Sequence, residues 1–151
     1  MEAVSMSGND TVIIDDIVLT DLADGDAVTL AFQGDIANVK TSKNGNSIYA
    51  FNNTGEVVNV TIRVLKGSRN DKYLNARLAS MKANFAGFVL INGDFTKKIG
   101  DGRGLITRDN YTLSGGIFTK NVDAKTNAEG DTEQSVSIYN IRFSNAPRSI
   151  N

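Results

Sequence analysis

Apolar and polar residues alternate over several stretches of the chain, and a period of two is typical of half-buried β-strands. The clearest stretch is 56–65, EVVNVTIRVL, where Val58, Val60, Ile62 and Val64 share one face. Residues 27–32 alternate in the same way, and residues 11–22 are apolar with inserted aspartates. The dipeptide Asp24-Gly25 lies between them, so the pattern predicts a β-hairpin over 11–32.

More strands are expected in the second half of the chain. Residues 88–93, FVLING, predict one strand, and 94–120 predict a strand, a Gly-rich turn and a strand starting near Tyr111. Residues 134–145 predict the last strand, but its alternation slips. Val136 and Ile138 lie on one face, and Tyr139, Ile141 and Phe143 on the other. This slip predicts a bulge, or a strand buried against two environments.

One segment has the period of a helix, at about 68–84. Ser68 is a suitable N-cap, and Asp71 lies three residues later in a position similar to that of a capping box. The core face of this helix is predicted to consist of four residues spaced at i, i+4, i+7 and i+11: Leu74, Leu78, Met81 and Phe85. The opposite face is basic.

Residues 38–56 predict a protruding hairpin or loop. Asn44-Gly45 suits a type I′ turn, in which both central residues have positive φ. The stretch KNGNSIYAFNN, residues 43–53, combines this turn signal with the apolar residues Ile48, Tyr49 and Phe51. Two interpretations stay open. The hairpin is either a surface that a neighbouring copy covers, or an ordinary surface hairpin whose Ile48 and Phe51 pack within their own domain.

The elements add up to six to eight strands and one helix, without βαβ alternation, so a parallel sheet is not expected. The predicted fold is mainly β: an antiparallel β-sandwich or barrel with one flanking helix. The 151 residues predict a single domain, with an N-terminal arm at 1–10 and a C-terminal tail at 145–151. We expect no secretion signal and no membrane span.

The composition excludes most catalytic chemistry. The chain has neither cysteine nor histidine, so thiolate nucleophiles, thiolate metal sites and the commonest general base are missing. Asp15 and Asp16 are adjacent in a predicted strand, where they would point to opposite faces rather than form an acid–base pair. We therefore expect no enzyme activity, no cofactor and no metal site.

Charge is divided unevenly along the chain. Residues 1–39 hold eight acidic residues and no basic ones, whereas residues 40–108 hold twelve basic and four acidic residues. Residues 109–151 are nearly balanced, and the formal net charge is −1. This division fits either two solvated faces or a self-complementary surface, in which the acidic face of one copy meets the basic face of the next.

The chain resembles the tail tube proteins of bacteriophages. The resemblance covers about residues 27–120 and rests on the segment NNTGEVVNVTIRVLKGSRNDKYLNA at 52–76, followed later by YTLSGGIF at 111–118. In that family a strand of alternating Val and Ile leads into a short stretch that opens a helix. The matching residues of that stretch are Gly67, Ser68, Asn70, Asp71, Leu74 and Asn75.

This resemblance implies a structural virion protein that forms six-membered rings, which stack into a hollow tail tube. DNA would pass through the lumen without specific binding. The partners implied are the protein itself, a tail sheath, a tape measure protein, and baseplate or tail-terminator proteins, in a virion assembled in the host cytoplasm. A contractile tail is favoured. The alternative is a non-enzymatic, β-rich baseplate or adhesin-like binding module.

The candidate contact residues between subunits and rings all lie on the predicted hairpin. They are Lys40, Lys43, Asn44, Asn46, Ile48, Tyr49, Phe51 and Asn53. The asparagines would offer hydrogen bonds, and the apolar residues would anchor in a pocket of a neighbour.

Overall fold

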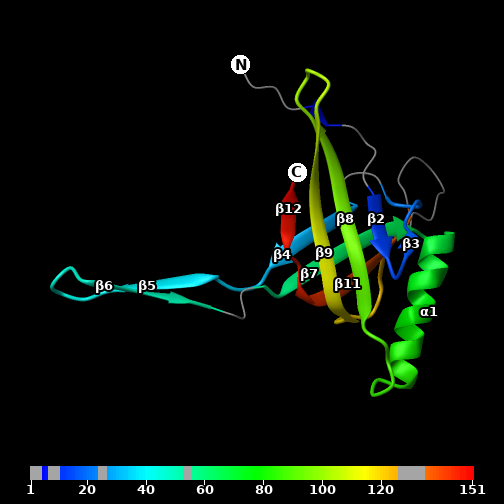
Figure 1. Ribbon diagram of the computed structural model, residues 1–151. Helices are drawn as coiled ribbons and strands as arrows, with labels where there is room; N and C mark the ends of the chain where they lie inside the picture. The colour runs from blue at the N-terminus through cyan, green and yellow to red at the C-terminus, as the bar shows by residue number, and fades with distance from the viewer. Residues whose placement is uncertain (1–4, 7–10, 24–26, 53–55, 126–134) are drawn as a thin grey trace.

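A computed structural model describes residues 5–6, 11–23, 27–52, 56–125 and 135–151 (Figure 1). The helix α1 spans Arg69–Ala83. The strands are β1 (Ser5–Met6), β2 (Thr11–Ile14), β3 (Ile17–Val18), β4 (Val28–Phe32), β5 (Ala37–Thr41), β6 (Ser47–Phe51), β7 (Val58–Leu65), β8 (Ile91–Gly100), β9 (Ile106–Phe118), β10 (Asp123–Lys125), β11 (Val136–Asn145) and β12 (Arg148–Ile150).

Ten strands form one antiparallel sheet in the order β3-β2-β8-β9-β11-β7-β4, with β1 added to β8, β10 to β11 and β12 to β9. The predicted fold class, mainly β with one flanking helix, is confirmed. The number of strands was underestimated, because the described chain contains twelve and several are only two or three residues long. The sheet curls so that β8 and β9 cross in front of β4, β7 and β11 (Figure 1). Its path ends at β3 and β4, so the arrangement is sandwich-like and not a closed barrel.

The centre of the sheet is the ladder between β7 and β11. Eight residue pairs follow in unbroken register from Val136↔Leu65 to Phe143↔Val58. The alternation predicted for residues 56–65 is confirmed, because Val58, Val60, Ile62 and Val64 are at most 1% exposed. Of the two alternatives predicted for residues 134–145, the bulge is absent from this ladder, whereas both faces of β11 hold buried residues, Val136 on one and Tyr139, Ile141 and Phe143 on the other. A register shift occurs instead in β8, between Ile91 and Gly93.

The helix begins as its sequence predicts. The Ser68 hydroxyl accepts a hydrogen bond from the Asp71 backbone N–H at 3.2 Å, and the Asp71 carboxylate accepts one from Gly67 N–H at 2.8 Å. The second bond reaches one residue further back than in the usual capping box, in which the Ncap N–H is the donor. Buried Asn70 also contributes, since its side-chain oxygen accepts hydrogen bonds from the backbone N–H groups of Thr20 and Asp21, each at 2.8 Å.

The end of the helix differs from the prediction. Leu74 and Leu78 are buried and Met81 packs against the core, but Phe85 is 65% exposed, so its assignment to the core face is wrong. The reason is the position of the helix end. Asn84 is the C-cap with a φ of −151°, and the chain has therefore left the helix before Phe85.

The hairpin predicted over 11–32 is also wrong. β4 pairs with β7 and not with the segment 11–22, while the turn at Asp24-Gly25 lies outside the described residues. β2 instead pairs with β3 through the two-residue turn Asp15-Asp16, in which both φ values are positive (49° and 65°). Aspartate is one of the few residues that adopt this conformation without large strain. The two carboxylates therefore belong to a turn and not to a strand.

The strands of the C-terminal half are longer than predicted. β8 starts at Ile91 and continues to Gly100, and β9 starts at Ile106, ahead of the expected position near Tyr111. Residues 148–150 were expected in a tail, but they form β12 and pair with Asp109–Tyr111 of β9. Residues 148–150 therefore add a short strand to the sheet beside β9.

Asp71 joins the helix start to the sheet. Besides the Gly67 N–H, its carboxylate accepts hydrogen bonds from the Tyr139 hydroxyl at 2.6 Å and from the Ser137 hydroxyl at 3.2 Å. Tyr139 is 1% exposed, and burial, helped by this hydrogen bond and by the Asp71 charge, raises the pKa of its phenol well above the usual value. One carboxylate thus satisfies polar groups from two elements that are distant in the sequence.

We expect Asp71→Ala to lower the free energy of unfolding by about 2–3 kcal/mol, because it removes a helix cap and leaves buried hydroxyls with fewer acceptors. Urea denaturation followed by circular dichroism measures the change. Lys72→Ala is the matched control at the next, exposed position of the same turn, and it should stay within about 0.5 kcal/mol of the parent. Equal stability of Asp71→Ala and Lys72→Ala would contradict this account of the cap.

Candidate functional site: a projecting hairpin arm

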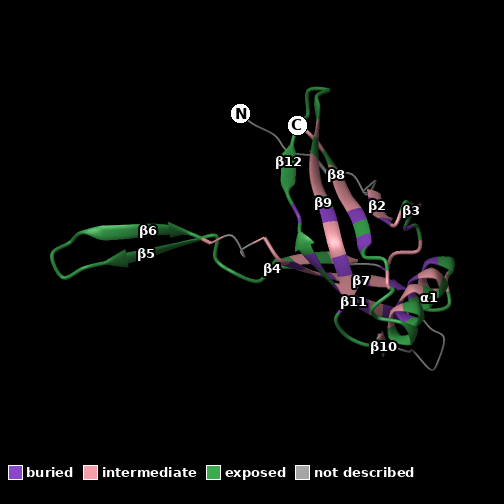
Figure 2. Cartoon of the chain, turned by 60° about the horizontal axis from the view of Figure 1, so that its bottom comes forward, coloured by how far each residue is buried: buried purple, intermediate pink, exposed green. Residues whose placement is uncertain are grey.

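β5 and β6 form a two-stranded sheet that is separate from the main sheet and projects from the body of the molecule (Figures 1 and 2). We call residues 36–52 the arm. Five residue pairs hold it together, from Ala37↔Phe51 to Thr41↔Ser47. Every residue of both strands is exposed. An isolated two-stranded hairpin is at best marginally stable in water, so the arm stands out as an element without a core.

The tip of the arm differs from the predicted type I′ turn. Gly45 has a φ of 84°, but Asn44 does not have a positive φ. Gly45 N–H donates to the Ser42 carbonyl at 3.0 Å, and Ser42 N–H donates to the Asn46 carbonyl at 2.7 Å. This is the pattern of a longer hairpin loop in which the glycine adopts the left-handed conformation. Asn-Gly therefore marked the turn correctly, but only the glycine uses its conformational freedom.

The register divides the arm into two faces, because residues directly opposite each other in an antiparallel pair point to the same side. Val39 pairs with Tyr49, and Ala37 with Phe51, so these four residues share one face, which we call the aromatic face. Lys40 pairs with Ile48 on the other face. The predicted apolar group Ile48, Tyr49 and Phe51 is therefore split between two faces.

The predicted contact residues are placed as follows. Lys40, Ile48, Tyr49 and Phe51 lie on the strands of the arm, Lys43, Asn44 and Asn46 lie in its loop, and Asn53 lies outside the described residues. Ile48, Tyr49 and Phe51 are 73%, 76% and 70% exposed. The interpretation in which Ile48 and Phe51 pack within their own domain is therefore wrong. The role of these residues in contacts with neighbours stays a prediction.

A cleft of about 430 Å³ lies at the base of the arm, and we call it the root cleft. Its apolar surface comes from Phe32 at the end of β4, from Tyr111 of β9 and from Ala146. The rings of Phe32 and Tyr111 are 6.5 Å apart. Gly34, Ile36, Glu56 and Arg148 complete the lining, and Phe32 and Ile36 are 45% and 58% exposed. The cleft is therefore an open, largely apolar surface beside the point where the arm leaves the body.

Arg148, the basic residue that lines the root cleft, is paired with the carboxylate of Asp109. Arg148 donates two hydrogen bonds to Asp109, each 2.8 Å long, and its guanidinium lies 5.7 Å from the centre of the Tyr111 ring. The hydrogen bond from Arg148 holds the pKa of the Asp109 carboxyl below its usual range. In the described part of the chain, no salt bridge engages Glu56. The base of the arm, which also carries exposed Asp35, therefore has an excess of negative charge.

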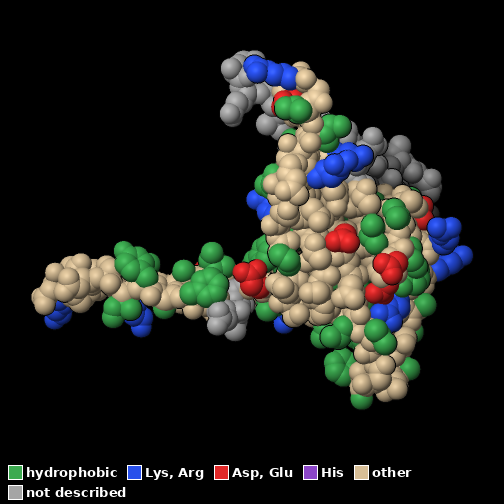
Figure 3. Space-filling view, viewed as in Figure 1, with side chains coloured by type: hydrophobic (Ala, Val, Ile, Leu, Met, Phe, Trp, Pro, Cys, Tyr) green, Lys and Arg blue, Asp and Glu red, His purple; other side chains and the backbone are tan. Residues whose placement is uncertain are grey.

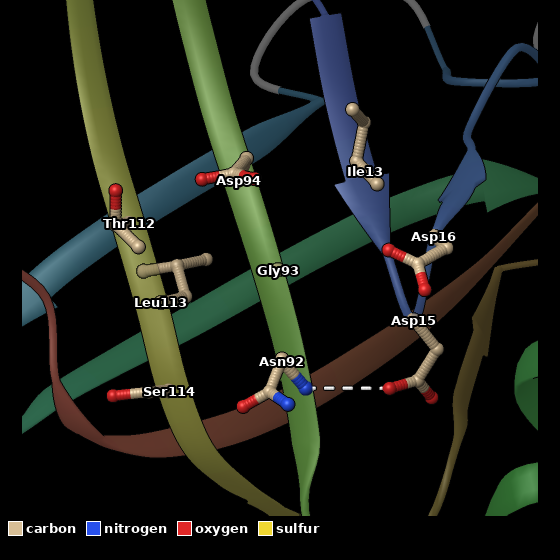
Figure 4. Close-up of a pocket in the computed structure, with 9 residues that line it drawn as sticks. All are labelled: Ile13, Asp15, Asp16, Asn92, Gly93, Asp94, Thr112, Leu113 and Ser114. Atoms are coloured by element: carbon tan, nitrogen blue, oxygen red, sulfur yellow. Dashed lines mark hydrogen bonds between the residues drawn. The ribbon is translucent and has the colours of Figure 1, made fainter.

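A second concave region, of about 320 Å³, lies on the outer surface of β2, β8 and β9 (Figure 4). Asp15, Asp16 and Asp94 line it together with polar groups such as Asn92 and Thr112. Asp15 is held in place by structural contacts, because its carboxylate accepts hydrogen bonds from Arg77 Nε at 2.9 Å and from Asn92 N–H at 3.3 Å. These contacts tie the β2–β3 turn to the helix and to the start of β8.

Two kinds of site are not found. Across the described ranges, no cluster of three or more histidine, cysteine, aspartate or glutamate side chains is arranged to hold a metal ion. None of the described helices combines the length and the apolar character required to cross a membrane.

Sequence reasoning missed the root cleft and part of the arm. Val39 and Ile36 are exposed apolar residues of the arm, and residues 36–42, IANVKTS, contain no clean alternation that would have identified them. The root cleft could not have been found from a local pattern either. Its lining joins residues near position 32 to residues near positions 111 and 148, which the curled sheet brings together.

No protein-family model matches the chain, and no curated protein matches its sequence. Solved structures do share its fold. A chain of the PVC sheath–tube complex of an extracellular contractile injection system, in the extended state, matches with a TM-score of 0.61 and 9% identity, over 94% of this chain and 88% of that chain. A chain of the anti-feeding prophage cap, described as a tube-terminating cap, matches with a TM-score of 0.59 and 9% identity, over 93% and 88%.

A chain of the anti-feeding prophage baseplate matches with a TM-score of 0.54 and 8% identity, over 96% of this chain and 95% of that chain. At these identities the likeness concerns the fold, over nearly the whole of both chains. The fold that the resemblance to tail tube proteins implied is thus the fold of chains in contractile injection particles.

The exposure of the arm leads to a prediction for the isolated protein. Amide hydrogens of β5 and β6 should exchange at least about 100-fold faster than those of β7 and β11, because local opening of the arm breaks no core contacts. Hydrogen exchange of the dilute monomer, followed by mass spectrometry, measures this ratio. Equal protection of the arm and the central ladder in the monomer would contradict it.

Proposed function

We propose that this protein is the protomer of a hollow tail tube, which forms by self-assembly into stacked, hexameric rings. The observation that carries the proposal is the arm. It is a folded hairpin in a sheet of its own, and its large apolar side chains are 57–76% exposed. A shared fold does not by itself imply a shared function. Here, however, the shared fold comes with a surface that only another molecule can cover.

The energetics of the arm favour such assembly. Burying one large aromatic or aliphatic side chain contributes about 1.5–3 kcal/mol, and the arm exposes several of them at once. A contact between an arm and a different surface of the next copy is heterologous, so it produces closed rings or open filaments. Continuous pairing between copies would also protect sheet edges such as β4 and β12, which otherwise invite aggregation.

The outer surface of β8 and β9 suits the wall of a DNA channel. Asp94, Thr96, Asn110 and Thr112 lie on this surface, and Thr96 donates a hydrogen bond to Asn110 at 2.9 Å. They alternate with residues that pack against the core, among them Phe95, Tyr111 and Leu113. These four surface residues offer no cation to phosphates, so DNA can pass over this part of the surface without being held. The same face carries the exposed pair Lys98 and Arg108 farther along the two strands, so the proposed channel wall is limited to the part around Asp94 and Thr112.

In this proposal the protein is a structural component of a phage particle, assembled in the host cytoplasm, and it has no enzyme activity. The tube serves genome ejection. Its neighbours are a contractile sheath, a tape measure protein, and baseplate or terminator proteins. The structural likeness to a chain from a sheath–tube complex supports the contractile type of tail.

A second candidate function is a component at one end of such a particle, in the baseplate or the cap. The chains from a prophage baseplate and from a tube-terminating cap have the same fold, and this favours the second candidate. The two candidates differ in the number of rings that one protein can stack. A tube protomer adds to itself without limit, whereas an end component forms one ring or disc.

Purified protein at high concentration should form rods with a central channel, visible by negative-stain electron microscopy. Apolar burial drives this assembly, so it should persist over a range of salt concentrations. Single rings or discs that do not stack would favour the baseplate or cap. Monomers at every concentration and salt condition tested would contradict self-assembly.

The charge-reversed variant Lys40→Glu/Lys43→Glu should stack poorly while keeping its fold. Both lysines lie on the exposed arm, and surface charges guide encounter and register more than they stabilise the monomer. Rod length by electron microscopy and thermal unfolding of the monomer are the two measurements. Lys72→Glu/Lys120→Glu is the matched control, with the same change of charge at two exposed positions away from the arm. Normal rods from the arm variant would contradict the prediction.

A further inference from the structure

The arm and the root cleft are two unfilled apolar surfaces on the same molecule. The aromatic face of the arm presents Val39, Tyr49 and Phe51, which are 57%, 76% and 70% exposed. The root cleft offers about 430 Å³, within the range of roughly 300–1,000 Å³ that is usual for pockets that hold small ligands. Phe32 and Tyr111 line it and leave room for another ring to pack against theirs.

The charges of the two surfaces are complementary. The arm carries Lys40 and Lys43 and contains no carboxylate between residues 36 and 52. Its base carries Asp35 and Glu56, while the nearby Arg148 is already paired with Asp109. In the space-filling view the blue lysines lie toward the tip of the arm, and red side chains lie where it joins the body (Figure 3). A basic arm therefore matches the acidic rim of a root cleft.

The cleft cannot receive the arm of its own chain. Ile36 is both the first residue of the arm and part of the cleft lining, and the hairpin runs away from the body from this point (Figure 1). The ladder of five pairs would have to break for the tip to return. A second copy of the chain carries the same basic, aromatic hairpin and meets no such restriction.

We propose that the root cleft receives the aromatic face of the arm of a second copy, with Tyr49 in the cleft and the neighbouring Lys40 paired to Glu56 at the rim. Lysine can lay its methylene stem along an apolar surface while its ammonium group reaches a carboxylate from the other side of the strand. Each copy has one arm and one cleft, so the contact is heterologous and repeats from copy to copy. This assignment deepens the proposed function and rests on it, because it names the surface that covers the arm.

Cysteine cross-linking tests the contact directly, since the chain has no cysteine of its own. The variants Tyr49→Cys and Phe32→Cys are prepared separately, mixed at equal concentration under assembly conditions and oxidised. We expect clearly more disulfide-linked dimer on non-reducing gels from this mixture than from either variant oxidised alone. Tyr49→Cys mixed with Val18→Cys is the matched control, because Val18 is similarly exposed (47%) but lies on β3, outside the cleft lining, and should give little product.

A charge swap tests the rim in the same assay. Adding Lys40→Glu to the Tyr49→Cys variant should lower the cross-linking yield by about fivefold, as expected for reversing one partner of a partly exposed ion pair. Adding Glu56→Lys to the Phe32→Cys variant should restore the yield when the two changed partners are mixed. Thermal unfolding of each variant establishes that the monomer fold is retained.

The outcomes separate this inference from the proposed function. Rods that form without the Tyr49–Phe32 cross-link would overturn the cleft assignment and leave the tube proposal standing. Absence of both rods and cross-link would overturn both. A cross-link whose yield does not respond to the charge swap would overturn the pairing of Lys40 with Glu56.

Discussion

The ladder between β7 and β11 is the interaction on which the rest of the structure depends. It joins residues that are about 80 positions apart in the sequence through eight consecutive pairs, and its core side chains are almost completely buried. β4 adds to one side of the ladder, β9 to the other, and the helix packs nearby. Register in a sheet is strongly specified where one face is buried, because a slip of one residue would turn every apolar side chain outward.

Asp71 shows how the helix is tied to this ladder. The same carboxylate caps the helix start and accepts hydrogen bonds from the hydroxyl groups of two residues of β11, Ser137 and Tyr139. A buried hydroxyl that lacks a partner costs free energy, so this arrangement favours one position of the helix on the sheet. The body of the molecule is thus organised by a few buried contacts between segments distant in the sequence.

The arm, in contrast, is held together by contacts between residues that are close in the sequence, and it has no buried core. Its five pairs are local in sequence, its side chains are exposed on both faces, and nothing in the described body packs against its strands. Sheets that fold alone need three or more strands or a covering element. The body therefore supplies a stable frame, while the arm is suited to complete its packing on another molecule. In the root cleft the body also offers the kind of surface that such packing requires.

Local patterns in the sequence were sufficient for the elements that local physics controls. The alternation in residues 56–65 and the cap at Ser68 predicted β7 and the start of the helix, because strand faces and helix caps are set within a few residues. The same holds for the presence of a hairpin around Asn44-Gly45, although not for the conformation of its turn.

Strand partners, and the surfaces that depend on them, were decided only by the tertiary structure. β4 pairs with β7, which follows it in the chain, and not with the preceding segment 11–22, as the sequence had predicted. Phe85 is exposed because the helix ends two residues before it. The root cleft joins residues near positions 32, 111 and 148. A pattern of period two states which residues share a face, but it carries no information about which distant strand that face will meet.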